Sequence, residues 1–264
     1  MVFGALLIAA QLCRFDGYPA SVSVVAQDKS LTASIHPSPN FWAKDFDFSC
    51  VSPWNSASGR LRAGTAISPR HVVFANHFPI APGARMIFIG EDGGACPCTL
   101  AKTARVGSTD IMIGALDYEL TPNIKPAKVM PEDWLEHVAG VTNFPTVTFT
   151  QNETLLYSEF VLASTNLSYL ALRHRSPERE RIAIQGPRGP IVVPEEAIQR
   201  HGMIRVGDSG NPAFMVWNGE PVLMYCLLNG GVGSGPWLHL RLKEIQESMD
   251  ELAPGYQLNV IGLK

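Results

Sequence analysis

Short runs of apolar and β-branched residues, broken by Gly, Pro, Asn and Ser, follow one another from about residue 60 onward. Several short strands at this spacing are typical of an all-β barrel or sandwich. A first set of strands is predicted at 63–67, 71–75, 85–89, 100–106 and 111–116. The proline-punctuated segment 121–131 then predicts an extended connector, followed by a helical turn in 132–138.

A second set of strands is predicted to begin near Val147. It continues at 155–162, 169–172, 182–184, 191–193, 212–216 and 222–228, and Asn218-Gly219 predicts a hairpin turn between the last two. Apolar residues then recur at helical spacing (Leu242, Ile245, Met249 and Leu252), so residues 240–252 are expected to form an amphipathic helix. Residues 257–261 could add a strand after it.

Composition narrows the classes of function. The 264 residues are 46% hydrophobic and 17% charged, which is enough apolar material for a core. The net charge of −3 gives no basic field for phosphates, so no nucleic-acid binding is expected. The apolar stretch at 2–12 falls well short of the roughly 20 residues that a membrane-spanning helix needs, so no membrane span is expected.

The length of that apolar stretch suits a secretory signal, although no Lys or Arg precedes it. Residues 1–28 are therefore interpreted as a signal or an N-terminal extension, and the alternative is an ordinary strand. We expect a secreted or periplasmic protein, with a cytoplasmic location as the alternative.

The five cysteines do not form the pattern of a dense disulfide framework. Cys96-Pro97-Cys98 lacks the Cys-x-x-Cys spacing of zinc and redox sites, and no His-Glu-x-x-His occurs. No metal and no cofactor are expected.

The strongest chemical signal is Gly207-Asp208-Ser209-Gly210. A serine hydroxyl becomes a nucleophile when a base takes its proton and a third group orients that base. His77 and Asp110 could supply these roles, and the order His, Asp, Ser along the chain is one of the known orders of a catalytic triad. Asp110 lies 33 residues after His77 and 99 residues before Ser209.

Three segments carry a resemblance to a known family: Phe74-Ala75-Asn76-His77-Phe78, Asp110 with the apolar run 111–116, and Gly207-Asp208-Ser209-Gly210. They resemble the trypsin-like (chymotrypsin-fold) serine peptidases, in particular the disulfide-poor bacterial-type branch. The resemblance implies two six-stranded antiparallel β-barrels with a C-terminal helix. It places the peptidase domain at 29–264, with barrels at 29–130 and 131–264.

The resemblance also implies roles for individual residues. His77 would be the general base, Asp110 would orient it, and Ser209 would be the nucleophile, with Asp117 a weaker substitute for Asp110. The backbone N–H groups of Gly207 and Ser209 would form the oxyanion hole. The residues implied to bind the substrate are Met203, Leu228, Asn229 and Gly230.

The chain departs from the family at several of these places. No Ile-Val-Gly-Gly segment occurs in 28–60 to pair with Asp208, so Asp208 needs another partner, for which Arg205 is a candidate. We expect that no activation cleavage is needed. Met203 at the base of the specificity pocket predicts no preference for Arg or Lys in the substrate, and favours small or apolar residues.

The expected function is a serine endopeptidase that cleaves a peptide or protein substrate through an acyl-enzyme. One alternative is an inactive binding protein that keeps the fold, and another is a hydrolase restricted to one target or to its own chain. An α/β-hydrolase is excluded, because Asn211 stands where Gly-x-Ser-x-Gly needs glycine and too little chain follows Ser209 for an acid and a histidine.

Overall fold

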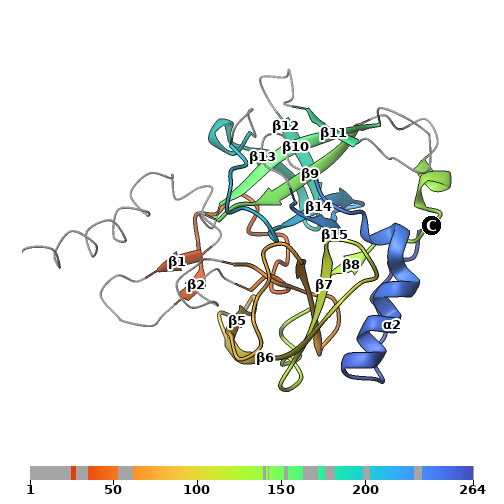
Figure 1. The fold of residues 1–264 in the computed structure, drawn as a ribbon. Coiled ribbons are helices and arrows are strands. Elements are labelled where there is room, and N and C mark those ends of the chain that lie inside the picture. The colour runs from red at the N-terminus through yellow and green to blue at the C-terminus, as the bar shows by residue number, and fades with distance from the viewer. Residues whose placement is uncertain are drawn as a thin grey trace, which may run out of the picture.

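The structure is a computed structural model, and it describes residues 25–27, 35–52, 62–138, 141, 143–151, 154–162, 172–175, 182–198, 203–228 and 234–263. Strands dominate these residues, and two larger sheets pack together with a helix along one side (Figure 1). A small ladder joins β1 (Val25–Gln27) to β2 (Ile35–Pro37).

The first large sheet has five strands in the order β3-β4-β7-β6-β5, all antiparallel. These are β3 (Thr65–Ala66), β4 (His71–Ala75), β5 (Arg85–Ile89), β6 (Ala95–Arg105) and β7 (Ile111–Leu116). The long β6 changes register between Leu100 and Lys102, so its first half pairs with β5 and its second half with β7. Every residue of β4 is buried, which places β4 in the core.

The second large sheet has six strands in the order β11-β10-β9-β14-β15-β8. Its members are β8 (Lys128–Val129), β9 (Asn143–Phe149), β10 (Leu155–Leu162), β11 (Leu172–Arg175), β14 (Pro212–Trp217) and β15 (Glu220–Cys226). All neighbours are antiparallel except β8, which runs parallel to β15. A separate hairpin joins β12 (Ile182–Gly186) to β13 (Gly189–Val193).

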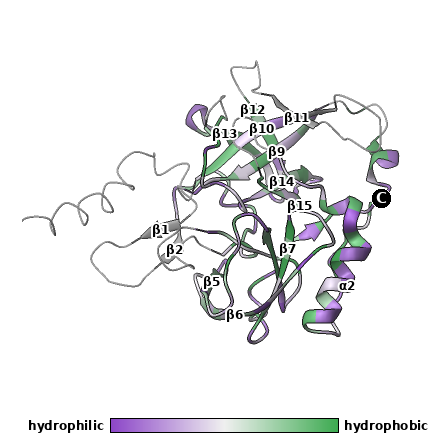
Figure 2. Cartoon of the chain, in the orientation of Figure 1, coloured by the Kyte–Doolittle hydropathy of each residue, from purple (hydrophilic) through white to green (hydrophobic). Residues whose placement is uncertain are grey.

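Short helices border the second sheet: η1 (Trp134–Val138), η2 (Glu195–Ala197) and η3 (Leu238–Arg241). η3 leads directly into α2 (Leu242–Leu252), which lies beside β6 and β7. Ile245 and Met249 are buried, and Figure 2 shows hydrophobic and hydrophilic residues alternating along α2 as the predicted amphipathic pattern requires. The expected strand at 257–261 is limited to a single parallel bridge, Val129 to Val260.

The predicted all-β class with a C-terminal helix is confirmed. The hairpin turn at Asn218-Gly219 is also confirmed, with positive φ angles of 48° and 82° as its two-residue loop requires. The resemblance implied two six-stranded barrels. Among the described residues, the strand pairings give two open sheets, one of five strands and one of six. The first sheet ends at β3 and β5, and the second at β11 and β8.

An aromatic cluster fills the core beside the second sheet and contains a buried histidine. His239 is 2% exposed and packs against the rings of Trp134 and Trp237, at centroid distances of 5.7 and 5.8 Å. Neither of its ring nitrogens has a hydrogen-bond partner among the described residues. Burial lowers the pKa of His239 from 6.5 to about 4, because the charged imidazolium is poorly solvated there.

Because the pKa of His239 is lowered in the folded chain, we expect the free energy of unfolding to fall at acid pH. The unfolded chain takes up the proton below pH 6.5 while the folded chain resists it, so stability present above pH 6.5 is lost as the pH falls towards 4. His239→Phe should reduce the loss in the free energy of unfolding between pH 7 and pH 4.5 by roughly 2 to 3 kcal/mol. Urea unfolding at both pH values measures this. The exposed His137, changed to Gln, is the control and should leave the loss unchanged.

Candidate active site

The sheet register brings His77 and Asp110 together. β4 and β7 are antiparallel with Ala75 opposite Ile111, so the residues that follow β4 meet those that precede β7. The Asn76 N–H continues this ladder by donating to the Asp110 carbonyl over 2.8 Å. Two residues 33 positions apart therefore sit side by side at one end of the first sheet.

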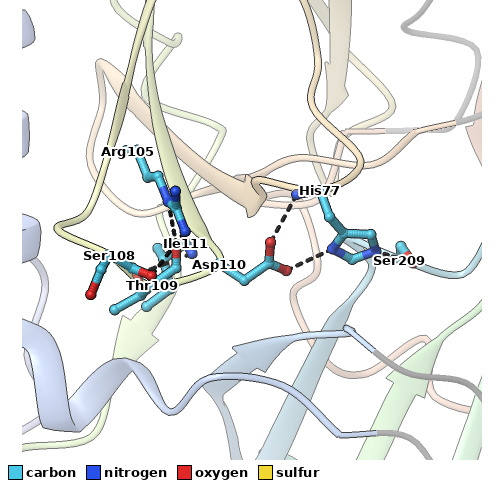
Figure 3. A network of polar contacts seen from close by, with 7 residues as sticks. All are labelled: His77, Arg105, Ser108, Thr109, Asp110, Ile111 and Ser209. Carbon is cyan, nitrogen blue, oxygen red and sulfur yellow. Dashed lines mark hydrogen bonds and ion pairs between the residues drawn. The ribbon is translucent and has the colours of Figure 1, made fainter.

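The three predicted residues form one hydrogen-bonded chain (Figure 3). Asp110 Oδ1 accepts the backbone N–H of His77 at 2.8 Å, and Asp110 Oδ2 lies 2.6 Å from His77 Nδ1. On the other side of the ring, His77 Nε2 lies 2.8 Å from Ser209 Oγ. Because a carboxylate oxygen only accepts, Nδ1 carries the ring proton and the lone pair of Nε2 faces the serine hydroxyl. The site can therefore take a proton from Ser209.

A tight loop before β7 presents Asp110. The Arg105 side chain donates from Nε to the Thr109 carbonyl at 2.6 Å and from Nη2 to the Ser108 carbonyl at 2.8 Å (Figure 3). Thr109 Oγ1 in turn donates to the Val106 carbonyl at 2.6 Å and accepts the Ile111 N–H at 3.2 Å. These bonds hold the backbone on both sides of Asp110, so its carboxylate has a fixed direction.

Ser209 reaches the site from the turn that precedes β14. Gly210, directly after it, has φ of +87°, and its N–H donates to the Leu227 carbonyl at 2.8 Å. A Cβ at Gly210 would lie 3.5 Å from the carbonyl oxygen of Ala63 and 3.6 Å from the backbone nitrogen of Ala75. The two sheets thus approach closely here, and this approach places Ser209 against His77.

The two backbone N–H groups named for the oxyanion hole flank Asp208. Gly207 has φ of +103°, a conformation that favours glycine, and the Asp208 N–H donates back to the Arg205 carbonyl at 3.0 Å to close the turn. Among the described residues, the N–H groups of Gly207 and Ser209 donate to no protein acceptor. Both are therefore available to an acceptor on a bound substrate.

The carboxylate of the buried Asp208 accepts its hydrogen bonds from backbone N–H groups. The residue is 2% exposed, and its carboxylate accepts the Gln151 N–H at 2.6 Å and the Arg205 N–H at 2.5 Å. Burial raises the pKa of Asp208, and these two hydrogen bonds, together with the charge of Arg205, oppose that rise. The expected partner Arg205 thus contributes both its backbone amide and its charge, and Gln151, which was not expected, supplies a second amide.

The remaining predicted residues are more scattered. Met203 packs, partly buried, against the hydrophobic cluster that contains Trp134, and the partly exposed Leu228 donates its N–H to the Ser234 carbonyl at 2.7 Å. Asn229 and Gly230 lie outside the described residues.

Asp117, the weaker substitute for Asp110, follows the far end of β7 and accepts the Thr99 N–H at 2.8 Å. It follows that Asp110, and not Asp117, is the acid beside His77.

A cavity of about 680 Å³ lies apart from His77, Asp110 and Ser209. Its lining comes from the segment around Phe41 to Val51, the connector 125–128 and the turns near Arg188 and Glu220. Ion pairs on its wall include Lys125 with Asp47 at 2.9 Å and Lys128 with Glu220 at 2.5 Å. This cavity contains none of the residues of the candidate active site.

Within the described ranges, no group of three or more His, Cys, Asp or Glu residues is arranged to hold a metal ion. The helices in the same part of the chain are all too short or too polar to cross a membrane. All four described cysteines, which are Cys50, Cys96, Cys98 and Cys226, are buried and unpaired by disulfides.

No protein-family model matches the chain. No curated protein matches it either. Among solved structures, the chain is similar to human heparin binding protein, with 14% sequence identity and a TM-score of 0.48, over 79% of this chain and 94% of that one.

Proposed function

We propose that this protein is a trypsin-like serine endopeptidase that uses His77, Asp110 and Ser209. The observation that carries the proposal is the continuous hydrogen-bonded chain from Asp110 through His77 to Ser209. Three segments distant in the sequence supply these side chains, and each distance is within the range for a functional triad.

The first half of the proposed reaction forms an acyl-enzyme. Ser209 Oγ attacks the carbonyl carbon of a peptide bond while its proton passes to His77 Nε2, and the charged imidazolium is stabilised by Asp110. The carbonyl oxygen becomes an oxyanion that accepts hydrogen bonds from the Gly207 and Ser209 N–H groups. When the C–N bond breaks, His77 returns the proton to the leaving amine.

The second half repeats these steps with water. His77 takes a proton from a water molecule whose oxygen attacks the ester carbon, and the bond to Ser209 Oγ breaks as the serine recovers its proton from His77. Every proton and electron pair is carried by the protein and water, so the proposed reaction needs no cofactor.

The environment of Asp208 supports activity without a prior cut. In the family that the chain resembles, a new N-terminus pairs with the matching aspartate after cleavage. Here the two amide donors to Asp208 come from Gln151 and Arg205 within the folded chain. The turn that carries Ser209 is therefore held without a liberated N-terminus.

The test is cleavage of denatured casein by the whole chain, with the mass of the protein measured before and after the assay. We expect peptides to appear while the enzyme keeps its original mass, and we expect none from the Ser209→Ala variant. Casein cleavage that begins only after the chain loses an N-terminal segment would contradict activation-free catalysis. Absence of cleavage by a folded, uncut chain would favour the alternative of a binding protein.

A further inference from the structure

Gln151 contacts the turn that carries Ser209 from both sides of Gly207. Its side-chain Nε2 donates to the carbonyl oxygen of Val206 at 3.0 Å. Its backbone N–H donates to Asp208 Oδ1 at 2.6 Å. One residue, more than fifty positions away in the sequence, thus holds the peptide before Gly207 and the side chain after it.

The second sheet fixes the position of Gln151. The residue lies in the hairpin turn between β9 and β10, where the Thr150 N–H donates to the Thr154 carbonyl at 3.0 Å. The buried hydroxyls of the same two threonines lie 2.7 Å apart. β9 is also paired with β14, with Thr148 opposite Ala213. β14 begins shortly after Ser209, at Pro212. The pairing of β9 with β14 therefore fixes the hairpin that carries Gln151 relative to the nucleophile.

The contact with Val206 sets the direction of the Gly207 N–H. In a trans peptide the C=O and the N–H point in opposite directions, and the described residues contain no cis peptide bond. When Gln151 holds the Val206 carbonyl on its own side, the Gly207 N–H is turned to the opposite side. Were this peptide to rotate, a carbonyl oxygen would replace the N–H and repel a developing oxyanion.

Among the described residues, the hydrogen bonds between Arg205 and Asp208 close the turn around this peptide, and Gln151 alone binds its carbonyl oxygen. The Val206 side chain is 99% exposed, so no packing holds it, and Gly207 has no side chain. A Cβ added at Gly207 would lie only 2.5 Å from Gln151 Oε1, so the amide of Gln151 packs directly over the glycine backbone. The glutamine side chain is therefore in direct contact with both residues of this peptide.

We propose that Gln151 is the positioning residue of the oxyanion hole. Its side chain holds the Val206–Gly207 peptide so that the Gly207 N–H is directed at the substrate oxyanion. The inference rests on the proposed function. Gln151 acts through the peptide and does not itself touch the reacting atoms. It adds a side-chain anchor to a hole that is otherwise formed by backbone alone.

The experiment measures the rate at which a fluorophosphonate labels Ser209 at pH 8. Ser209 Oγ forms a bond to phosphorus, the P–F bond breaks to release fluoride, and the serine proton passes to His77. The phosphoryl oxygen takes the place of the oxyanion, so the rate reports the orientation of the Gly207 N–H. Gln151→Ala and Gln151→Met both remove the donor while keeping the backbone N–H to Asp208, and the methionine also keeps the side-chain volume.

We expect both variants to be labelled about 10- to 100-fold more slowly than the parent, somewhat less than the loss of a whole oxyanion-hole donor. With p-nitrophenyl acetate, kcat should fall by a similar factor and KM should change little, because the lost interaction is made in the transition state. The matched control is Gln185→Ala, which removes a side-chain donor to the Gly186 carbonyl on the β12–β13 hairpin and should label at the parent rate.

The outcomes separate the two proposals. A parent protein that is not labelled at Ser209 would overturn the proposed function itself. A parent that is labelled, together with a folded Gln151→Met variant labelled at the same rate, would overturn the role of Gln151 and leave the triad intact. A rise in KM at constant kcat would also contradict it, because that change indicates lost substrate binding and an unchanged oxyanion hole.

Discussion

Replacing Ser209 with alanine is expected to lower the turnover of a peptide or ester substrate by about 10⁶-fold. The change removes Oγ, the protein atom that bonds to the carbonyl carbon of the substrate in the proposed reaction. His77 keeps its hydrogen bonds to Asp110, so the fold should be undisturbed. Turnover of p-nitrophenyl acetate and of denatured casein, measured on the parent and the variant, checks this.

The matched control for this change is Ser108→Ala. Ser108 is exposed and close to the site, but it contributes only its backbone carbonyl, which accepts from Arg105 and is kept in the variant. Its turnover should equal that of the parent. Undiminished turnover in Ser209→Ala would mean that the activity comes from another nucleophile or from a contaminant.

Asp110→Asn is expected to lower turnover by about 10⁴-fold with little change in stability. Asp110 accepts two N–H groups of His77, one from the backbone and one from Nδ1. An asparagine offers one acceptor and one NH₂ group, so one of these contacts becomes donor against donor. If the ring responds by moving its proton to Nε2, it can no longer accept the proton of Ser209.

Asp117→Asn is the control for that change. Asp117 follows the opposite end of β7 and accepts the Thr99 N–H, which an asparagine oxygen can also accept. Turnover should be unchanged in this variant. A large loss in Asp117→Asn with little loss in Asp110→Asn would reverse the assignment of the acid.

The strands with clear boundaries were predictable from the sequence. The predicted ranges 71–75, 85–89, 111–116 and 155–162 coincide with β4, β5, β7 and β10. In each, a short apolar or β-branched run ends at residues that break strands. Two of these strands border His77 and Asp110, but the antiparallel register that brings the two residues together is not contained in the strand boundaries.

The start of β6 was not predictable in the same way. The strand was expected to begin at Leu100, and it begins at Ala95 and includes Pro97. Proline normally argues against a strand because it has no N–H to donate. Here it is tolerated because β6 pairs only with β5 at that point, and β7 joins the ladder from Leu100 onward.

The partners of Asp208 could be predicted only in kind. A buried carboxylate needs donors, and the sequence suggested the nearby charge of Arg205. The structure confirms Arg205 as a partner, through its backbone N–H and its charge, and adds the backbone N–H of Gln151. No local pattern marks Gln151, because its contact depends on how the β9–β10 hairpin lies against the turn before β14.

The proposed role of Ser209 as the nucleophile is tested most directly by labelling the purified protein with a fluorophosphonate, followed by mass spectrometry to locate the adduct. The Ser209→Ala variant is treated in parallel. An adduct on Ser209 of the parent, with none on the variant, is the predicted result, because only an activated serine reacts at a useful rate. A folded parent protein that takes up no label, or an adduct on another residue, would show that Ser209 is not an activated nucleophile.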